Sequence, residues 1–251
     1  MDRMIYTGLT AINATADSRI SQAQNLANLS VPGFRRDLEN EAGPKFLDAL
    51  GQATTRVFQS ETKEHLFSEK PGMLDRTGQD LDFAIADAGY FFVQQGEGDP
   101  ALSRRGDFHR AVDGTLKDGA GATLLDVNLA PVQVPPFQRI GVTDLGELEI
   151  VPLGGGPAQV VGVLATVVPE AGTALEKGAD GMIRAADGTV PPPNQQAKVL
   201  QGVLERSNVN PIEEMLGSIE LQRRFEIGMR TIMNARELDE AGSRLLRAPE
   251  A

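Results

Sequence analysis

Apolar side chains recur with a helical period at both ends of the chain, whereas the middle holds only short apolar runs. Near the N-terminus the apolar positions are separated by steps of three and four residues that average 3.5, the period of a heptad repeat. This pattern predicts an amphipathic helix that ends near Leu29 or Ser30, because Val31 precedes a proline. Its stripe faces either the chain's own core or a partner helix, and consists of Ile5, Leu9, Ile12, Ala16, Ile20, Ala23 and Leu26.

A second helix is predicted from Pro211 to Leu246. Asn210 suits the N-cap, proline suits the first helical position, and Glu213 completes an arrangement similar to a capping box. An unbroken helix of this length extends about 54 Å at 1.5 Å per residue. One small domain cannot cover a helix that long.

The apolar stripe of this second helix contains two polar positions, Gln222 and Glu226. Polar groups on a helical seam can fix the register of an assembly at a cost in stability. Alternatively, the helix is rotated so that Phe225 and Ile232 face inward and the polar pair faces water, and the sequence leaves both interpretations open. The stripe consists of Ile212, Met215, Leu216, Ile219, Gln222, Glu226, Met229 and Met233.

Between the helices the pattern predicts short strands joined by tight turns. The middle zone, residues 37–204, contains 22 of the 27 Gly and 12 of the 15 Pro. Asp-Gly pairs begin at Asp113, Asp118, Asp180 and Asp187, and such pairs are typical of hairpin turns. The predicted strands are Phe83–Ile85, Tyr90–Gln94, Val132–Val134, Leu148–Val151, Val160–Val168 and Val199–Leu204.

Charge changes the picture by excluding several partners. The 251 residues include 24 Lys and Arg against 35 Asp and Glu, a formal charge of -11, and residues 37–204 carry all of it with 13 basic and 24 acidic residues. Such a chain is repelled by nucleic acid and anionic membranes unless it has a basic patch. The pairs that begin at Arg35, Arg104 and Arg223 stand among carboxylates, so we expect them to be solvated or ion-paired. We expect no nucleic-acid partner.

Apolar length excludes a membrane span and a cleaved signal. The longest nearly apolar run, Val160–Val168, has nine residues, where a spanning helix needs about 20. The first 21 residues contain no continuous apolar stretch of the kind a secretory signal carries. We therefore expect no membrane insertion, and export by a route without a cleaved signal if export occurs.

Catalytic chemistry has no support in the sequence. There is no Cys, and His65 and His109 have 43 residues between them without metal-ligand spacing. No Gly-x-Ser-x-Gly motif occurs, and the glycines at 154–156 lack the spacing of a phosphate loop. We expect no enzyme activity, no catalytic residue, no cofactor and no metal.

Several blocks of the sequence resemble the rod and hook protein family of the bacterial flagellum. Residues 27–35 (ANLSVPGFR), which follow the first predicted helix, are similar to its N-terminal motif, and residues 204–215 and 222–226 resemble its C-terminal signature. Residues 81–85, 89–93, 105–108 and 113–116 are similar to its central β pattern. The motif positions are Asn28, Gly33, Phe34, Ser207, Asn208 and Glu214.

The resemblance implies an α+β chain whose terminal helices form a coiled-coil-like assembly domain around a mainly β middle. It implies a helical assembly domain at 1–30 and 210–251, a β-rich connecting domain at 31–75 and 192–209, and an outer β domain at 76–191. The helices of neighbouring copies would pack into a tube. The residues expected in that packing are Ile5, Leu9, Ile12, Ile20, Leu26, Ile212, Met215, Ile219, Gln222, Phe225, Met229 and Ile232.

The implied function is a structural subunit of the basal-body rod that links the motor to the distal rod and hook and transmits torque. The opening residues and modest length are most similar to a proximal-rod member, and a distal-rod or hook-type subunit is the alternative. Implied partners are other proximal and distal rod proteins, copies of the chain itself and the flagellar type III export apparatus, with assembly in the periplasm. Two further alternatives are a carbohydrate- or peptidoglycan-acting enzyme with an acidic cleft and an exported coiled-coil adaptor.

Overall fold

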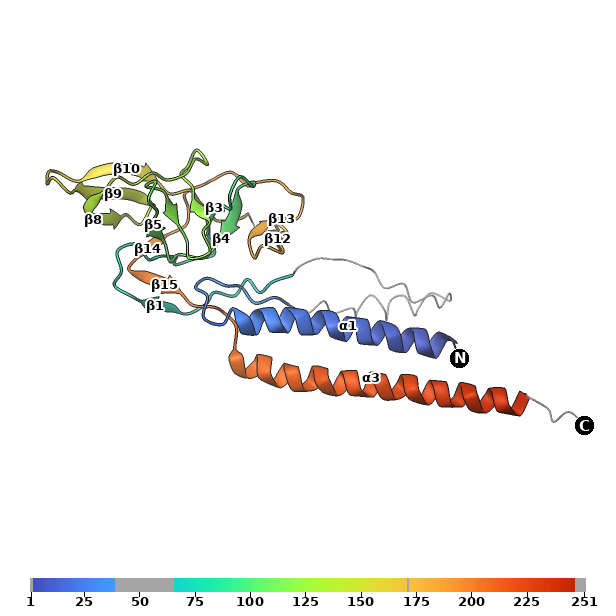
Figure 1. Ribbon diagram of the computed structural model, residues 1–251. Helices are drawn as coiled ribbons and strands as arrows, with labels where there is room; N and C mark the ends of the chain where they lie inside the picture. The colour runs from blue at the N-terminus through green and yellow to red at the C-terminus, as the bar shows by residue number, and fades with distance from the viewer. Residues whose placement is uncertain (1, 39–65, 171, 247–251) are drawn as a thin grey trace, which may run out of the picture. The chain divides into compact units, whose positions relative to one another are not determined.

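The computed structural model describes residues 2–38, 66–170 and 172–246, which form two helices and a mainly β middle region. The chain divides into two compact units. One contains helices α1 (Asp2–Ala27) and α3 (Pro211–Leu246), and the other contains Asn28–Leu38 and all the strands (Figure 1). The predicted α+β class is therefore confirmed, with helices at both ends and strands between them.

Helix α3 has the predicted bounds and the predicted N-cap. The Asn210 side chain accepts a hydrogen bond from the Ile212 amide at 3.0 Å and donates one to the Glu213 carboxylate at 3.1 Å. The helix-start prediction is thus confirmed, although Glu213 binds the capping side chain rather than the capping backbone amide that a capping box uses.

Helix α1 ends at Ala27, slightly before the predicted end at Leu29 or Ser30. The chain turns directly after the helix, because the Val31 amide donates to the Asn28 carbonyl at 3.2 Å. Pro32 has no amide to donate, so the helical pattern cannot continue through it. Helices α1 and α3 pack against each other in an antiparallel pair within their unit (Figure 1).

The strands of the β unit form antiparallel sheets. The largest has the order β12-β13-β4-β3-β7-β6-β5, with β11 also paired to β3, and a separate three-stranded sheet has the order β10-β9-β8. Two small sheets pair β1 with β15 and β14 with β2. The strands are β1 (Leu74–Arg76), β2 (Phe83–Ile85), β3 (Tyr90–Gln94), β4 (Ala101–Ser103), β5 (His109–Arg110), β6 (Leu116–Lys117), β7 (Thr123–Leu124), β8 (Phe137–Val142), β9 (Glu147–Pro152), β10 (Gln159–Val163), β11 (Thr166–Val167), β12 (Leu175–Lys177), β13 (Ile183–Ala185), β14 (Val199–Gln201) and β15 (Val203–Glu205).

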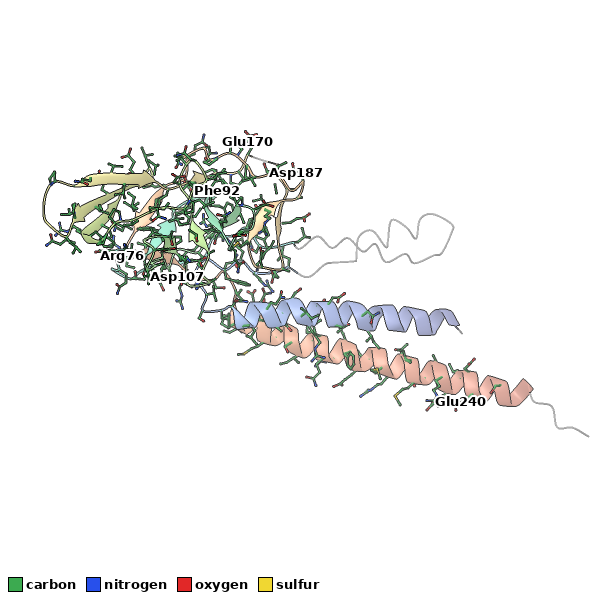
Figure 2. The ribbon with its side chains drawn as sticks, turned by 45° about the horizontal axis from the view of Figure 1, so that its top comes forward. Arg76, Phe92, Asp107, Glu170, Asp187 and Glu240 are labelled. Atoms are coloured by element: carbon green, nitrogen blue, oxygen red, sulfur yellow. The ribbon has the colours of Figure 1, made fainter. Side chains whose placement is uncertain are left out.

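Strand β3 lies between two apolar clusters, which explains its run of consecutive apolar residues. Successive side chains of a strand point to opposite faces. Phe91 belongs to the larger cluster, where its ring meets Phe108 edge-on with centroids 5.8 Å apart. Tyr90 and Phe92 belong to the second cluster, and Phe92 lies among the strands in Figure 2. A strand buried on both faces does not show an alternating pattern.

Two of the predicted strands are divided in the structure. The run Val160–Val168 separates into β10, which pairs with β9, and β11, which pairs with β3, because the chain crosses from one sheet to another at Leu164 and Ala165. The run Val199–Leu204 is divided at Gly202, whose φ of +69° ends β14 before β15 begins. In both cases one apolar run serves two sheets.

The other strand and turn predictions have mixed outcomes. Strands β2 and β3 have the predicted bounds, and β9 extends the predicted Leu148–Val151 by one residue at each end. The predicted strand Val132–Val134 was wrong: Gln133 forms only an isolated bridge to Thr115. The glycines of the Asp113, Asp180 and Asp187 turns have positive φ angles, as hairpin turns require, whereas the Asp118 turn places its positive φ at Gly121.

Candidate assembly surface and a buried ion-pair network

One face of α3 carries a row of exposed apolar side chains. Ile212, Met215 and Ile219 are each more than half exposed, at 68%, 59% and 59%, and Met229 is 41% exposed. The first three are spaced by three and four residues, and Met229 follows Ile219 by ten residues, nearly three turns, so all four lie along one side of the helix. Figure 2 shows side chains projecting from α3 along its length to Glu240 near its end. We call this row, completed by Leu216 and Met233, the outer stripe of α3.

The outer stripe of α3 is interrupted by a polar pair. Gln222 and Glu226 are both exposed, and the Gln222 amide nitrogen lies 3.5 Å from a Glu226 carboxylate oxygen. Phe225 and Ile232 are half-buried on the other side of the helix, together with the buried Leu221. Within the chain, therefore, α3 is rotated so that its polar pair faces water. The role of Gln222 in a larger assembly stays a prediction.

The predicted stripe of α1 lies largely outside the contact with α3. Ile20 and Leu26 are 59% and 41% exposed, whereas Ile12 is half-buried and lies at Gly228 of α3. The side chains of Ile5 and Leu9 fall outside the side chains that the structure describes. Of the described predicted packing residues, only Ile12, Phe225 and Ile232 are half-buried within the chain itself.

Polar side chains occupy the described contact between α1 and α3. Gln22 and Asn25 are 8% and 2% exposed, and Glu214 of α3 is 3% exposed. The Gln22 amide donates to the Glu214 carbonyl at 2.8 Å, and the Asn25 amide nitrogen lies 3.5 Å from the Glu214 carboxylate. These polar groups are buried alongside the apolar Leu221 and Ala235, while the outer stripe of α3 stays exposed. Exposed apolar rows of this kind mark interaction surfaces.

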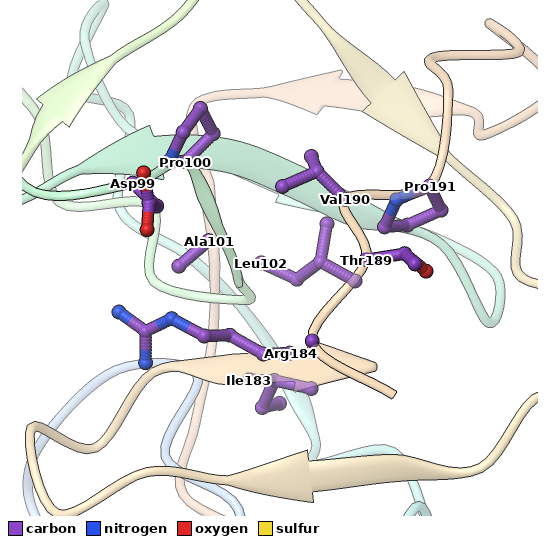
Figure 3. Close-up of a pocket in the computed structure, with 10 residues that line it drawn as sticks. Asp99, Pro100, Ala101, Leu102, Ile183, Arg184, Thr189, Val190 and Pro191 are labelled. Carbon is purple, nitrogen blue, oxygen red and sulfur yellow. The ribbon is translucent and has the colours of Figure 1, made fainter. Parts of the chain in front are cut away.

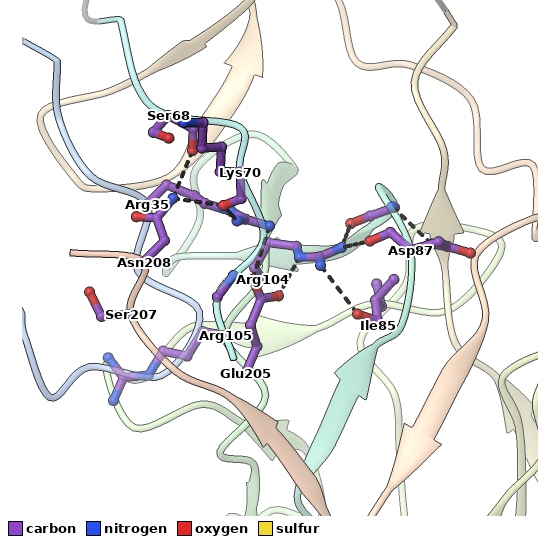
Figure 4. Close-up of polar contacts among 12 residues, drawn as sticks. Arg35, Ser68, Lys70, Ile85, Asp87, Arg104, Arg105, Glu205, Ser207 and Asn208 are labelled. Atoms are coloured by element: carbon purple, nitrogen blue, oxygen red, sulfur yellow. Dashed lines mark hydrogen bonds and ion pairs between the residues drawn. The ribbon is translucent and has the colours of Figure 1, made fainter. Parts of the chain in front are cut away.

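A buried ion-pair network lies where four segments of the β unit meet. The Glu205 carboxylate contacts the Arg104 guanidinium at 2.7 Å and the Arg35 guanidinium at 3.1 Å, and all three side chains are at most 3% exposed (Figure 4). The Gly72 amide also donates to Glu205, at 2.7 Å. Charge-assisted hydrogen bonds of this geometry are stronger than hydrogen bonds between neutral groups. One carboxylate thus joins the segments of residues 33–38, 70–72, 103–105 and 203–209.

Arg104 also binds the backbone of the β unit. Its guanidinium donates to the carbonyls of Ile85, Asp87 and Gly89, and lies 5.8 Å from the centroid of the Tyr90 ring (Figure 4). Arginine suits this position because its planar fork can bind several acceptors at once. The side chain therefore anchors the start of β3 to Glu205.

Lys177 ties β12 to the segment that follows α1. Its ammonium donates to the Arg35 carbonyl at 2.8 Å and to Asp37 at 2.7 Å, and it lies 3.7 Å from the centroid of the Phe34 ring. Burial lowers the pKa of Lys177, and the hydrogen bond to Asp37 opposes that change. Burial likewise lowers the pKa of Arg35, against the attraction of Glu205.

The resemblance-based motif residues fall in two places. Gly33 has a φ of +67° and donates to the Glu205 carbonyl, and a side chain there would meet the Arg104 carbonyl. Asn208 accepts from the Arg36 amide at 2.6 Å and donates to the Ser68 and Lys70 carbonyls at 3.0 and 2.7 Å. The Ser207 hydroxyl accepts a hydrogen bond from the Val209 amide, and the Asn28 main-chain carbonyl accepts one from the Val31 amide. Phe34 lies under Lys177, whereas Glu214 belongs to the helix pair.

The described residues offer no arrangement typical of an enzyme site. They contain no group of three or more His, Cys, Asp or Glu side chains placed to hold a metal, and no helix long and apolar enough to cross a membrane. A small hollow of about 40 Å³ beside Leu102 and Arg184 has room for a few waters (Figure 3). A broader groove of about 550 Å³ beside Leu74 and Leu200 has no carboxylate in its lining.

The network residues were only partly foreseen from the sequence. Arg35 and Arg104 are ion-paired, one of the two roles expected for them, but their burial was not predicted. Glu205 and Lys177 were not singled out at all. The signal available was weak: Glu205 ends a short strand and Arg104 follows one, and a charged residue at a strand end is ordinarily solvated.

Comparison with known proteins identifies the class. Residues 84–185 match the family model described as the flagellar hook protein FlgE/F/G D1 domain, and residues 200–245 match the flagellar basal body rod FlgEFG protein C-terminal model. The chain belongs to this flagellar rod and hook protein family. The family consists of structural flagellar proteins rather than enzymes, so a carbohydrate- or peptidoglycan-acting enzyme is not favoured.

Individual relatives match over nearly the whole chain. The flagellar basal-body rod protein FlgF of Salmonella typhimurium is 32% identical, covering 98% of this chain and 99% of that protein. The FlgF protein of Caulobacter vibrioides is 31% identical, covering 96% of each. The rod protein FlgG of Bacillus subtilis is 26% identical, covering 95% of this chain and 97% of that protein.

Proposed function

We propose that the chain is a structural subunit of the proximal part of the flagellar basal-body rod, where it links the motor to the distal rod and hook and transmits torque. The observation that carries the proposal is the pair of exposed apolar rows on α1 and α3, in a chain that belongs to the rod and hook family. FlgF relatives near 30% identity support the proximal position. The similarity to FlgG supports a distal-rod subunit as the second candidate.

The exposed rows support helix-to-helix assembly. Fully burying an exposed Ile or Met side chain contributes about 1.5–3 kcal/mol, so burial of the six side chains of the outer stripe favours association. In the proposed rod, the outer stripe of α3 and the exposed row of α1, with Ile20 and Leu26, pack against helices of neighbouring copies and of other rod proteins. The terminal helices at residues 1–30 and 210–251 then act as a coiled-coil-like assembly domain.

The buried network supports a mechanical role for the segments between helices and strands. Torque transmission requires that the chain on both sides of the β unit be firmly attached to it. Glu205, Arg35 and Arg104 attach the segment after α1 and the segment before α3 to the same point. In the proposed division, residues 31–75 and 192–209 connect the assembly helices to an outer β domain at 76–191.

Family membership also supports a location and an export route. We place the subunit in the periplasmic rod, delivered by the flagellar type III export apparatus. The acidic β region, which carries the whole net charge of -11, then stays solvated at the outside of the assembly.

Fractionation of a strain that lacks this chain tests the proposal. Complementation with the tagged chain should restore motility. The tagged chain should also copurify with detergent-extracted basal bodies in an amount comparable to that of other rod proteins. Complete basal bodies in the deletion strain, with the chain confined to the cytoplasmic fraction, would contradict the proposal. If the basal bodies of the deletion strain retain the proximal rod but lack the distal rod, the second candidate is favoured.

A further inference from the structure

We propose that Gln22 of α1 and Gly217 of α3 form a register lock that fixes the two helices at a single antiparallel alignment. The proposal builds on the rod function, because the lock sets the offset between the exposed row of α1 and the outer stripe of α3. A neighbouring copy would then bind a surface on which the two apolar rows have one fixed offset.

The first half of the lock is a buried amide. Gln22 is 8% exposed, and its amide nitrogen donates to the main-chain carbonyl of Glu214 at 2.8 Å. A buried amide is costly unless it is hydrogen-bonded. The helix pair is therefore stable only in an alignment where this side chain reaches an α3 carbonyl.

The second half is a glycine that makes the approach possible. A Cβ added at Gly217 would lie 2.5 Å from the Gln22 amide nitrogen, so any side chain there displaces the amide. Inside a helix glycine is less favourable than alanine. The presence of glycine at this helical position is explained by the close approach of Gln22 rather than by helix formation.

A second contact of the same kind lies three helical turns along. A Cβ at Gly228 would lie 3.2 Å from Cγ1 of Ile12, so this glycine also receives an α1 side chain. The two glycines are 11 residues apart on α3, and Ile12 and Gln22 are 10 residues apart on α1. At 1.5 Å per residue these spacings are about 16 and 15 Å, so both contacts fit in one alignment.

A shift of the helices by one turn loses both contacts. A shift in one direction would place Gln22 at Leu221 and Ile12 at Ile232. A shift in the other direction would place Gln22 at Glu213 and Ile12 at Arg224. Asn25, whose amide lies 3.5 Å from the Glu214 carboxylate, would move away from that group as well. Each loss disfavours the shifted alignment, whereas an apolar seam without these contacts would tolerate sliding.

The consequence for assembly is geometric. A one-turn slip of α1 along α3 would move Ile20 and Leu26 by about 5.4 Å relative to Ile212 and Ile219. Apolar side chains on a neighbouring copy could not fit both rows after such a slip. The lock therefore makes the relative position of the rows a property of the single chain.

Distance measurements between spin labels test the lock directly. The chain has no native Cys, so Ala23→Cys and Asn234→Cys place two labels at exposed positions that are separated mainly along the helix axes, where a slip changes the distance between them. Double electron–electron resonance should show one narrow distance distribution. In Gly217→Ala the maximum should shift by about 5 Å or the distribution should at least double in width. The substitution raises intrinsic helix propensity, so lost helix formation cannot produce this result.

Two further variants complete the test. Ser218→Ala changes the neighbouring, exposed position and should leave the distribution unchanged. Gln22→Ala removes the buried amide that restricts the alignment, and it should broaden the distribution even though Gly217 is retained. A broad distribution in the unsubstituted chain, or an unchanged distribution in Gly217→Ala, would overturn the proposal.

The outcome is separable from the rod function. If the chain copurifies with basal bodies but Gly217→Ala keeps the original distances, the lock is wrong and the rod function stands. If the distances change as expected but the chain is absent from basal bodies, the lock stands and the rod function is wrong.

Discussion

Arg104 donates from its Nε to a carboxylate oxygen of Glu205 across 2.7 Å, and only 1% of each side chain is exposed. Charges this deeply buried are tolerated because the remaining hydrogen-bonding groups are largely satisfied. Glu205 also binds Arg35 and the Gly72 amide, and Arg104 also binds three carbonyls. Removing one partner leaves the others buried without compensation, which is far more costly than losing a surface ion pair.

Glu205→Ala should therefore destabilise the β unit by about 3–5 kcal/mol, since two guanidinium groups lose their common carboxylate. Urea unfolding of the full chain, followed by the near-ultraviolet signal of Tyr90 in the β unit, gives the change in the free energy of unfolding. The neighbouring Arg206→Ala is the matched control, because Arg206 pairs with Asp75 at 3.4 Å with both side chains more than half exposed. Its effect should stay below about 1 kcal/mol. Equal losses would contradict the assignment of the network.

Gly33→Ala should be strongly destabilising for two reasons. Its φ of +67° is unfavourable for other residues by about 1–2 kcal/mol, and the added Cβ would meet the Arg104 carbonyl. Gly188→Ala is the control: its φ is +74°, but nothing lies within 4 Å of the Cβ position. Thermal unfolding should therefore show the backbone cost alone for Gly188→Ala and a clearly larger loss for Gly33→Ala. Similar losses would mean that the contact with Arg104 carries no cost.

Three turn aspartates should make the β unit sensitive to acid. The hydrogen bond from Thr115 lowers the pKa of Asp113, that from Arg184 lowers the pKa of Asp180, and that from Thr189 lowers the pKa of Asp187. Because the folded pKa lies below the unfolded one, the unfolded state binds protons first. The stabilisation is complete above about pH 5 and is lost as the pH falls through the lowered values.

The triple variant Asp113→Asn, Asp180→Asn and Asp187→Asn isolates this effect. Asparagine keeps an oxygen for the turn amides but carries no charge, so the variant should lose this stabilisation at pH 7 and should no longer titrate at these three positions. Denaturant unfolding at pH 5 and pH 2.5 should show a smaller difference for the variant than for the unsubstituted chain. If the free energy of unfolding depends on pH equally in the variant and in the unsubstituted chain, these three aspartates are not the source of the acid sensitivity.

The helices could be predicted from the sequence because their signals are local. Asn210, Pro211 and the long periodic pattern fix the start and extent of α3 without any tertiary information. The faces of the helices could not be predicted in the same way. Periodicity locates an apolar row, but the sequence does not say that Gln22 and Asn25, rather than Ile20, would be buried.

The β unit shows where sequence reasoning stops. Runs such as the one from Val160 to Val168 indicate buried strand, but a crossing between sheets at Leu164 leaves no local mark. The network of Arg35, Arg104 and Glu205 depends on contacts separated by about 100 residues or more along the chain. Such pairings follow from the topology of the fold, and the local sequence around each residue does not indicate its distant partner.

The central claim is that the outer stripe of α3 is an assembly surface, and incorporation of stripe variants into basal bodies tests it most directly. Ile219 is 59% exposed on the stripe, and Ile219→Val, which keeps the position apolar, is the matched control. In a strain that lacks the chain, Ile219→Asp should be absent from purified basal bodies and fail to restore motility. Ile219→Val should be incorporated at close to the normal level. Normal incorporation of Ile219→Asp, with the charge in place and the chain expressed, would contradict the claim.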